Sequence, residues 1–271
     1  MWKREEEEDR KKEERRMDET LGRIVESFRE GDALSAGKIL DDVVAGDVSF
    51  ALEISVKLID RKSSSLAFSS VETRHFGYSI LQRVLRSKFR ELAGDSRKSE
   101  EMFRLVLQEL HLSSSAGASE PWAIKSKVAQ ITAEFIKLEG SRAWMSFSES
   151  ISGLLKSEDP FECELGAIVT RYVAEDVALH SDEVFADKVR DLLSGMTTTI
   201  NEITNSFFLA VETHFRLEKM FWQQNEAIKR KEHSNTLSAV LEAISVYAEW
   251  APLVPFVRSR LVDTCSALLV R

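Results

Sequence analysis

The sequence predicts an all-α protein, built as a HEAT-like α-solenoid of antiparallel helix pairs in a right-handed superhelix. Glycine and proline are scarce, at 11 and 4 of 271 residues, which disfavours the turn-rich β-sandwiches and barrels. Apolar residues recur at helical spacing in about eleven segments, and no segment reads convincingly as a strand. Helix–turn–helix units recur about every 40 residues, which is typical of HEAT repeats. A multi-helix bundle is the structural alternative.

The stretch from 121 to 155 shows the repeating unit most clearly. Its first half carries one apolar stripe at helical spacing, formed by Ala123, Val128, Ile131, Phe135 and Leu138. Gly140 can close that helix in a left-handed conformation, and Ser141 can cap the next one. A second stripe follows, formed by Trp144, Phe147, Ile151, Leu154 and Leu155. Because neither helix can bury its face alone, the pair needs neighbours of the same kind.

The N-terminal part divides into a charged extension, 1–16, and a set of HEAT-like repeats, 17–112. Residues 3–16 are charged without interruption, and pairs such as Glu7 with Lys11 favour a solvated helix. Helices are predicted from Met17 to near Gly31, and from there to near Gly46. Asp47 can cap a third helix, ending near 59. After a loop at 61–70, Ser69 and Glu72 have capping-box spacing for the next helix.

A flexible connector is predicted at 113–119, and residues 119–271 are predicted to form further helical repeats. Asp159 and Pro160 open one helix, with Glu162 at the capping-box position. Ser181 can cap a long helix that Gly195 can kink, and Ala251-Pro252 stops another. Buried positions are predicted between these helices at Trp144, Phe147, Ile168, Tyr172, Leu241 and Trp250.

The last predicted helix, 256–269, is apolar on more than one side. A solenoid normally ends in a capping repeat with a polar outer face. We therefore expect an exposed apolar surface here, where a following repeat would dock, and expect the chain to be a fragment of a longer protein.

Composition indicates a soluble, intracellular protein. The formal charge of −8 disfavours a dedicated non-specific nucleic-acid binder, although it leaves a local basic face open. Cys163 and Cys265 are isolated, which fits a reducing compartment and gives no zinc spacing. No stretch approaches the roughly 20 apolar residues of a membrane span, and the charged N-terminus is unlike a secretory signal.

The residues predict no catalytic, metal or cofactor site. The sequence lacks the phosphate-binding, dinucleotide-binding, zinc-protease and nucleophile-elbow motifs. Glu72 and His75 form one E-x-x-H, but no second copy exists to complete a helical metal site. Basic clusters are the remaining signal, and each is either a solvated face or a contact for phosphate or an acidic partner. They lie at 83–90, at Lys229 to Lys231, and at Lys125 and Lys127.

Four segments, taken in order, resemble the exportin-5/HASTY family of karyopherins in the importin-β superfamily. They are RHFGYSILQRVLRSKFREL (74–92), WAIKSKVAQITAEFIKLEGSRAW (122–144), AEDVALHSDEV (174–184) and VYAEWAPLVPF (246–256). The resemblance covers about residues 30 to 270 and corresponds to the N-terminal portion of the family, whose members are several times longer. It implies that the repeats at 119–271 belong to the exportin-1/importin-β-like domain of that family. The charged run at 3–16 and the serine-rich loop at 61–70 depart from the family pattern.

The resemblance implies a nuclear export receptor that shuttles between nucleus and cytoplasm. Its implied partners are the Ran GTPase in its GTP form and structured small RNA, such as a microRNA precursor. It implies no enzyme activity, no cofactor, no small-molecule substrate and no membrane. The Ran contact is implied on inner helices near 70–90 and 122–139, and the candidate Ran or RNA contacts are Arg74, Arg83, Arg86, Lys88, Lys125, Lys127 and Glu134. A generic helical-repeat scaffold for protein interactions is the alternative.

Overall fold

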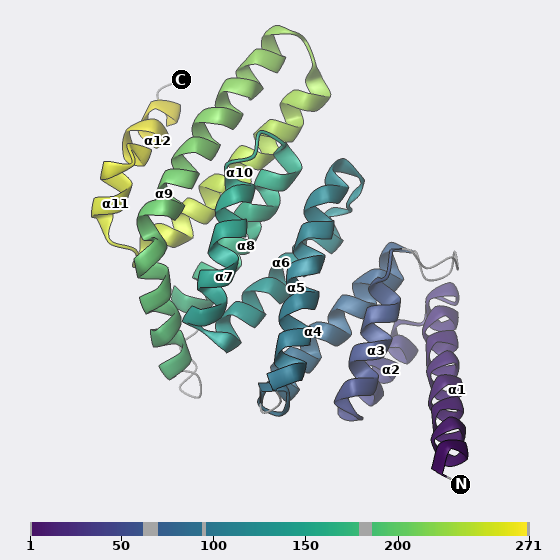
Figure 1. The fold of residues 1–271 in the computed structure, drawn as a ribbon. Helices are drawn as coiled ribbons and strands as arrows, with labels where there is room; N and C mark the ends of the chain where they lie inside the picture. The colour runs from purple at the N-terminus through teal and green to yellow at the C-terminus, as the bar shows by residue number, and fades with distance from the viewer. Residues whose placement is uncertain (1, 62–69, 94–95, 179–185, 270–271) are drawn as a thin grey trace. The chain divides into compact units, whose positions relative to one another are not determined.

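The computed structural model describes residues 2–61, 70–93, 96–178 and 186–269, which form α-helices and one short 3-10 helix with no strand among them (Figure 1). The helices group into two compact units, 1–96 and 97–271. The prediction of an all-α helical-repeat fold is confirmed. The contacts divide the chain into compact units at residue 96. The predicted division at 112–119 concerns families of repeats and stays a prediction.

The first unit contains four helices: α1 (Trp2–Arg29), α2 (Ala33–Ala45), α3 (Val48–Ile59) and α4 (Val71–Ala93). The charged run is helical and continuous with the amphipathic part of α1, and Lys11 Nζ donates to Glu7 Oε1 at 2.8 Å. Asp47 caps α3 as predicted, accepting a hydrogen bond from Phe50 N at 2.9 Å. Ser69 lies outside the described residues. Ser70 caps α4 instead, with Thr73 N donating to its Oγ at 3.1 Å.

Helices α3 and α4 pack closely at Gly77, the glycine of the His-Phe-Gly segment. A β-carbon built on Gly77 would lie 2.8 Å from Leu58 Cβ and 2.9 Å from Ile59 Cγ2. Ser55 Oγ donates to Gly77 O at 2.9 Å across the same contact. The glycine is therefore required by the distance between the two helices.

Replacing Gly77 with alanine is expected to lower the free energy of unfolding by about 1–3 kcal/mol, because the added methyl group forces α3 and α4 apart. Gly22 in α1 is a matched control, since nothing lies within 4 Å of the position of its added β-carbon. Gly22→Ala should stabilise by about 0.5–1 kcal/mol through helix propensity alone. Chemical denaturation measures both changes. Equal effects of the two substitutions would contradict the close contact.

The second unit is built from helix pairs in two layers. Its elements are α5 (Ser96–Ala116), η1 (Gly117–Ser119), α6 (Trp122–Glu139), α7 (Ser141–Leu155), α8 (Pro160–Ala178), α9 (Ala186–Gln223), α10 (Ala227–Trp250), α11 (Leu253–Arg258) and α12 (Leu261–Leu269). Helices α6, α8 and α10 pack side by side in one layer, and α7 packs against α9 in the other (Figure 1). Contacts between α6 and α7, and between α9 and α10, join the layers.

The turns of this unit are fixed partly by local caps and partly by distant residues. Asp159 caps α8 as predicted, accepting from Phe161 N at 2.8 Å. The prediction that Ser141 caps α7 is wrong, because Ser141 is the first residue of that helix. Asp191 of α9 accepts instead from Ser141 N at 2.8 Å and from Ser141 Oγ at 2.9 Å. These two hydrogen bonds lower the pKa of Asp191 below its usual value.

The predicted core is confirmed at its centre and differs at its edge. Trp144, Phe147 and Ile168 are buried, and Trp144 Nε1 donates to Thr199 Oγ1 at 2.8 Å. Tyr172 and Trp250 are half-buried. The prediction for Leu241 is wrong, since it is 38% exposed. Its helix turns other residues inward, namely Val240, Ala243 and Tyr247.

Two other boundaries differ from the sequence prediction. Residues 113–119 are not a flexible connector but the last turn of α5 followed by a 3-10 turn. Gly195 lies within the unbroken span of α9, where it allows close contact with Ser141. The segment 256–269 is split into α11 and α12, because Arg260 takes a left-handed conformation with φ of 63°. Ser181 and residues 62–69 lie outside the described part of the chain.

The last two helices expose apolar side chains, as expected for this segment. Leu253, Val254 and Val257 of α11 and Val262 of α12 are exposed. A hollow of about 300 Å³ lies beside them, lined mainly by apolar residues of α10, α11 and α12.

Candidate partner-binding site

The predicted contacts on α4 lie on a partly exposed helix of the first unit. Arg83 is about half exposed and forms an ion pair with Asp41 of α2. Arg86 is exposed, while Lys88 and Arg74 are partly buried. Arg83 and Arg86 are three residues apart, so they share one face of the helix. Arg83 and Arg86 together form the basic face of α4.

The predicted contacts on α6 are placed differently. Only 4% of the Lys125 side chain is exposed, and its ammonium forms an ion pair with Glu164 of α8. The same ammonium lies 5.0 Å from the centre of the Phe161 ring. Glu134 is buried and Lys127 is partly exposed. The expectation that Lys125 faces an open surface is therefore corrected, because its charge is satisfied within the second unit.

The E-x-x-H motif forms no larger cluster. Glu72 is exposed and His75 is partly buried, both on α4. Within the described ranges, no group of three or more His, Cys, Asp or Glu side chains is placed to hold a metal ion. No helix in those ranges is long and apolar enough to cross a membrane.

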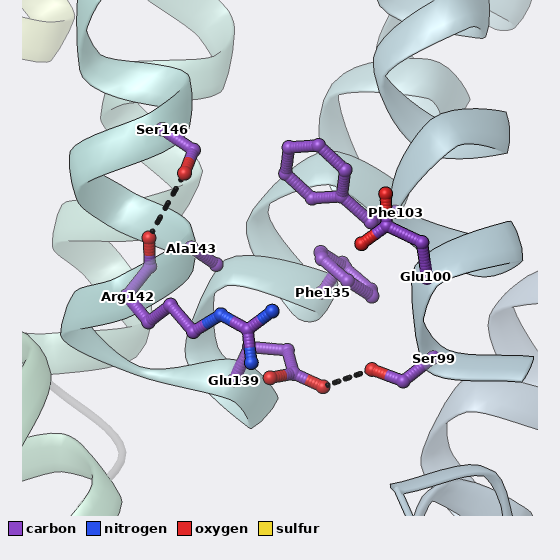
Figure 2. A pocket seen from close by; sticks show the side chains of 8 residues that line it. All are labelled: Ser99, Glu100, Phe103, Phe135, Glu139, Arg142, Ala143 and Ser146. Carbon is purple, nitrogen blue, oxygen red and sulfur yellow. Dashed lines mark hydrogen bonds between the residues drawn. The ribbon is translucent and has the colours of Figure 1, made fainter. Parts of the chain in front are cut away.

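A pocket of about 170 Å³ opens between α5 and the α6–α7 turn (Figure 2). Phe103 of α5 and Phe135 of α6 form its apolar wall, with ring centres 6.2 Å apart. Ser99 Oγ donates to Glu139 Oε1 at 3.0 Å, and the Arg142 side chain extends from α7 toward Glu139 (Figure 2). Glu100 also lines the pocket and accepts from Arg104 Nε at 3.1 Å.

Five of the eight residues that line the pocket are polar or charged, namely Ser99, Glu100, Glu139, Arg142 and Ser146. Apolar spacing within one helix does not predict this pocket, because its residues come from three helices and each pattern assigns them to ordinary core or surface. The turn between Glu139 and Arg142 is the one local feature that marks its position.

Two buried histidines join α9 to α10. His214 Nδ1 lies 2.8 Å from His233 Nδ1, and His214 Nε2 lies 3.1 Å from Ser157 O. Since Nε2 must donate to the carbonyl, His214 Nδ1 accepts from His233. Burial, together with the neighbouring His233, lowers the pKa of His214 to about 4. Burial also lowers the pKa of His233. The pair is therefore held in its neutral form.

Comparisons with known proteins agree with this architecture. Residues 121–271, which contain α6 to α12, match the family model described as exportin 1-like protein. The chain is 30% identical to protein HASTY 1 of Arabidopsis thaliana over 236 residues, which cover 87% of this chain and 19% of that protein. It is 22% identical to exportin-5 of Dictyostelium discoideum over 186 residues, which cover 66% of this chain and 16% of that protein.

The aligned region spans less than a fifth of the length of either relative. The family match nevertheless covers more than half of this chain, and it lies within the second helical unit. The chain belongs to the exportin 1-like protein family, as a member similar to HASTY and exportin-5.

Proposed function

We propose that the chain acts as part of an exportin-type transport receptor, which binds Ran in its GTP form and structured small RNA such as a microRNA precursor. In this role it shuttles between nucleus and cytoplasm and acts by binding, not by catalysis. The observation that carries the proposal is the exportin 1-like match over residues 121–271, supported by the similarity to HASTY and exportin-5.

The basic face of α4 is the part of the predicted Ran contact that remains most accessible. Arg83 and Arg86 lie on that face, whereas Lys125 and Glu134 on α6 are buried. Exposed arginines suit an acidic partner because their planar guanidinium groups bind carboxylates in bidentate fashion. We therefore place the Ran contact on α4, with a smaller contribution from Lys127.

Nucleotide-dependent capture tests the proposal. The immobilised chain is incubated with Ran loaded with a hydrolysis-resistant GTP analogue or with GDP, with and without a hairpin RNA that carries a short 3′ overhang. The proposal predicts retention of the GTP form only. In a receptor that binds both partners, Ran and RNA each favour binding of the other, typically by 1–3 kcal/mol. Equal capture of both nucleotide states would leave the alternative of a generic helical-repeat scaffold.

Charge reversal locates the contact. Arg83→Glu together with Arg86→Glu is expected to weaken binding of GTP-form Ran by about tenfold, through lost attraction and slower association. The control is Arg190→Glu on α9, another exposed arginine that pairs with a neighbouring carboxylate, Asp187. Both proteins should keep their helical circular dichroism. Equal affinities of the two variants would remove α4 from the Ran contact.

A further inference from the structure

The tip of the α9–α10 hairpin, residues 219–231, exposes a large aromatic ring among cations. Trp222 is 64% exposed and Ile228 is 78% exposed. Three consecutive cations, Lys229 to Lys231, follow in the first turns of α10 and are also exposed. The sequence singled out these cations, and the proposed Ran contact does not use them.

Backbone hydrogen bonds and one inward-facing ring connect the tip to the rest of the hairpin. Asn225 takes a left-handed conformation with φ of 61° in the turn between the helices. Its N donates to Trp222 O at 3.1 Å, and Glu226 N donates to Phe221 O at 2.9 Å. The Phe221 ring stacks on buried His233, with 5.3 Å between ring centres. Trp222 is therefore presented from a hydrogen-bonded backbone, which lowers the entropic cost of using it in binding.

Arg230 is stacked against the exposed tryptophan. The guanidinium carbon of Arg230 lies 4.9 Å from the centre of the Trp222 ring. Glu218 of α9 holds that guanidinium, accepting from Arg230 Nε at 2.7 Å. Since Trp222 remains mostly exposed with Arg230 in place, much of its ring surface is available for a second planar group.

The charge of the tip is opposite to that of the whole chain. Residues 219–231 contain four Lys or Arg and one Glu, whereas the chain carries a formal charge of −8. Glu226 is paired with Lys229 at 2.7 Å, and Glu218 with Arg230. Lys219 and Lys231 are exposed and make no ion pair with any residue that the structure describes. The tip therefore carries two cations without an ion pair to a described residue, Lys219 on α9 and Lys231 on α10, and Lys219 lies three residues before Trp222 on the same helix.

We propose that the hairpin tip binds an unpaired stretch of RNA, with one base stacked on Trp222 and phosphates held by Lys219 and Lys231. The inference rests on the proposed RNA partner and names the surface that would hold it. Aromatic rings with flanking cations form the usual platform for single-stranded nucleic acid, because every base has a flat face and every linkage a negative charge. A membrane-inserting tip is disfavoured, because polar Gln223, Gln224 and Asn225 separate Trp222 from Ile228.

Fluorescence anisotropy with the full chain and a labelled hairpin RNA with a 3′ overhang tests the assignment. Trp222→Ala should weaken binding about tenfold, because a stacked base is lost. Trp222→Phe should retain most of the wild-type affinity, since phenylalanine also offers a flat ring for stacking. Lys231→Ala should weaken binding and lower the slope of log affinity against log salt by about one, as expected for one phosphate contact.

The chain offers a closely matched control at Trp122, which is 63% exposed at the start of α6 and far from the tip in sequence. Trp122→Ala, and Lys38→Ala on α2, should leave RNA affinity unchanged. If Trp222→Ala binds RNA with the wild-type affinity, the assignment of the tip is overturned while the proposed RNA partner stands. No RNA binding by the wild-type chain would overturn both. Binding of the tip to anionic phospholipid vesicles, without binding to RNA, would also overturn it.

Discussion

Replacing Lys125 with alanine is expected to lower the free energy of unfolding of the second unit by about 3–5 kcal/mol. The substitution leaves Glu164, whose side chain is only 16% exposed, without its cation. Removing one partner of a buried ion pair is costly because an uncompensated charge remains in a poorly solvated site. The loss of the ammonium beside the Phe161 ring adds to this effect. The midpoint of thermal unfolding should fall by about 10 °C.

The adjacent residue Lys127 provides the control. It lies two positions further along α6 and is partly exposed, so Lys127→Ala should change stability by only about 0.5 kcal/mol. The double variant Lys125→Met with Glu164→Leu should recover most of the lost stability, because apolar residues of similar size can replace a buried ion pair. If Lys125→Ala unfolds at the wild-type temperature, the ion pair between Lys125 and Glu164 does not stabilise the second unit.

This result decides how partner contacts on α6 can be tested. Charge reversal at Lys125 would place a second carboxylate beside Glu164 and unfold the site. A loss of Ran binding in such a variant would then report misfolding, not a lost contact. The α4 variants are free of this difficulty because Arg83 and Arg86 are exposed.

Acid is expected to weaken the second unit through His214. Its pKa is about 4 in the folded chain, against about 6.5 for an unperturbed histidine. Between these values the unfolded state binds more protons, so stability falls as the pH is lowered from about 6.5 through about 4. Above pH 6.5 both states are neutral and the group adds no pH dependence. The full difference corresponds to roughly 3 kcal/mol.

Chemical denaturation at pH 7 and at pH 4.5 measures the effect. His214→Gln should lose about 2–3 kcal/mol less than the wild-type chain over this interval, since it has no group to protonate. The surrounding charges, Glu158 and Asp159, raise the pKa and are present in both proteins. His111→Gln, at an exposed histidine of α5 outside the buried pair, is the control for the loss of a histidine as such. Equal pH dependence of wild type and His214→Gln would show that the buried pair does not titrate as described.

The parts of the fold that the sequence predicted are those set by neighbouring residues. Apolar spacing located the helices. Asp47 and Asp159 could be predicted as caps because each accepts a hydrogen bond from a backbone N–H only two or three residues further along the chain. The cap of α7 could not be predicted, because Asp191 lies fifty residues further along the chain. The break at Arg260 was also missed, since arginine rarely adopts positive φ and nothing in the local pattern signals it.

The candidate contacts show the same limit. Arg83 and Lys125 both read as surface cations, but only Arg83 is exposed. The partner of Lys125 is Glu164 on α8, and spacing within one helix carries no information about that pairing. The cations of the hairpin tip were visible in the sequence. The exposure of Trp222 beside them was not, because it depends on which face α9 turns toward α10.

The most direct test of the account is a calorimetric titration of the chain with Ran in its two nucleotide states. An exportin-type receptor segment predicts measurable affinity for Ran bound to a hydrolysis-resistant GTP analogue and at least tenfold weaker binding of Ran bound to GDP. That affinity should fall in the Arg83→Glu, Arg86→Glu variant and should persist in Arg190→Glu. Equal affinity for both nucleotide states, or no binding of either at high micromolar concentration, would contradict the transport function proposed for this chain.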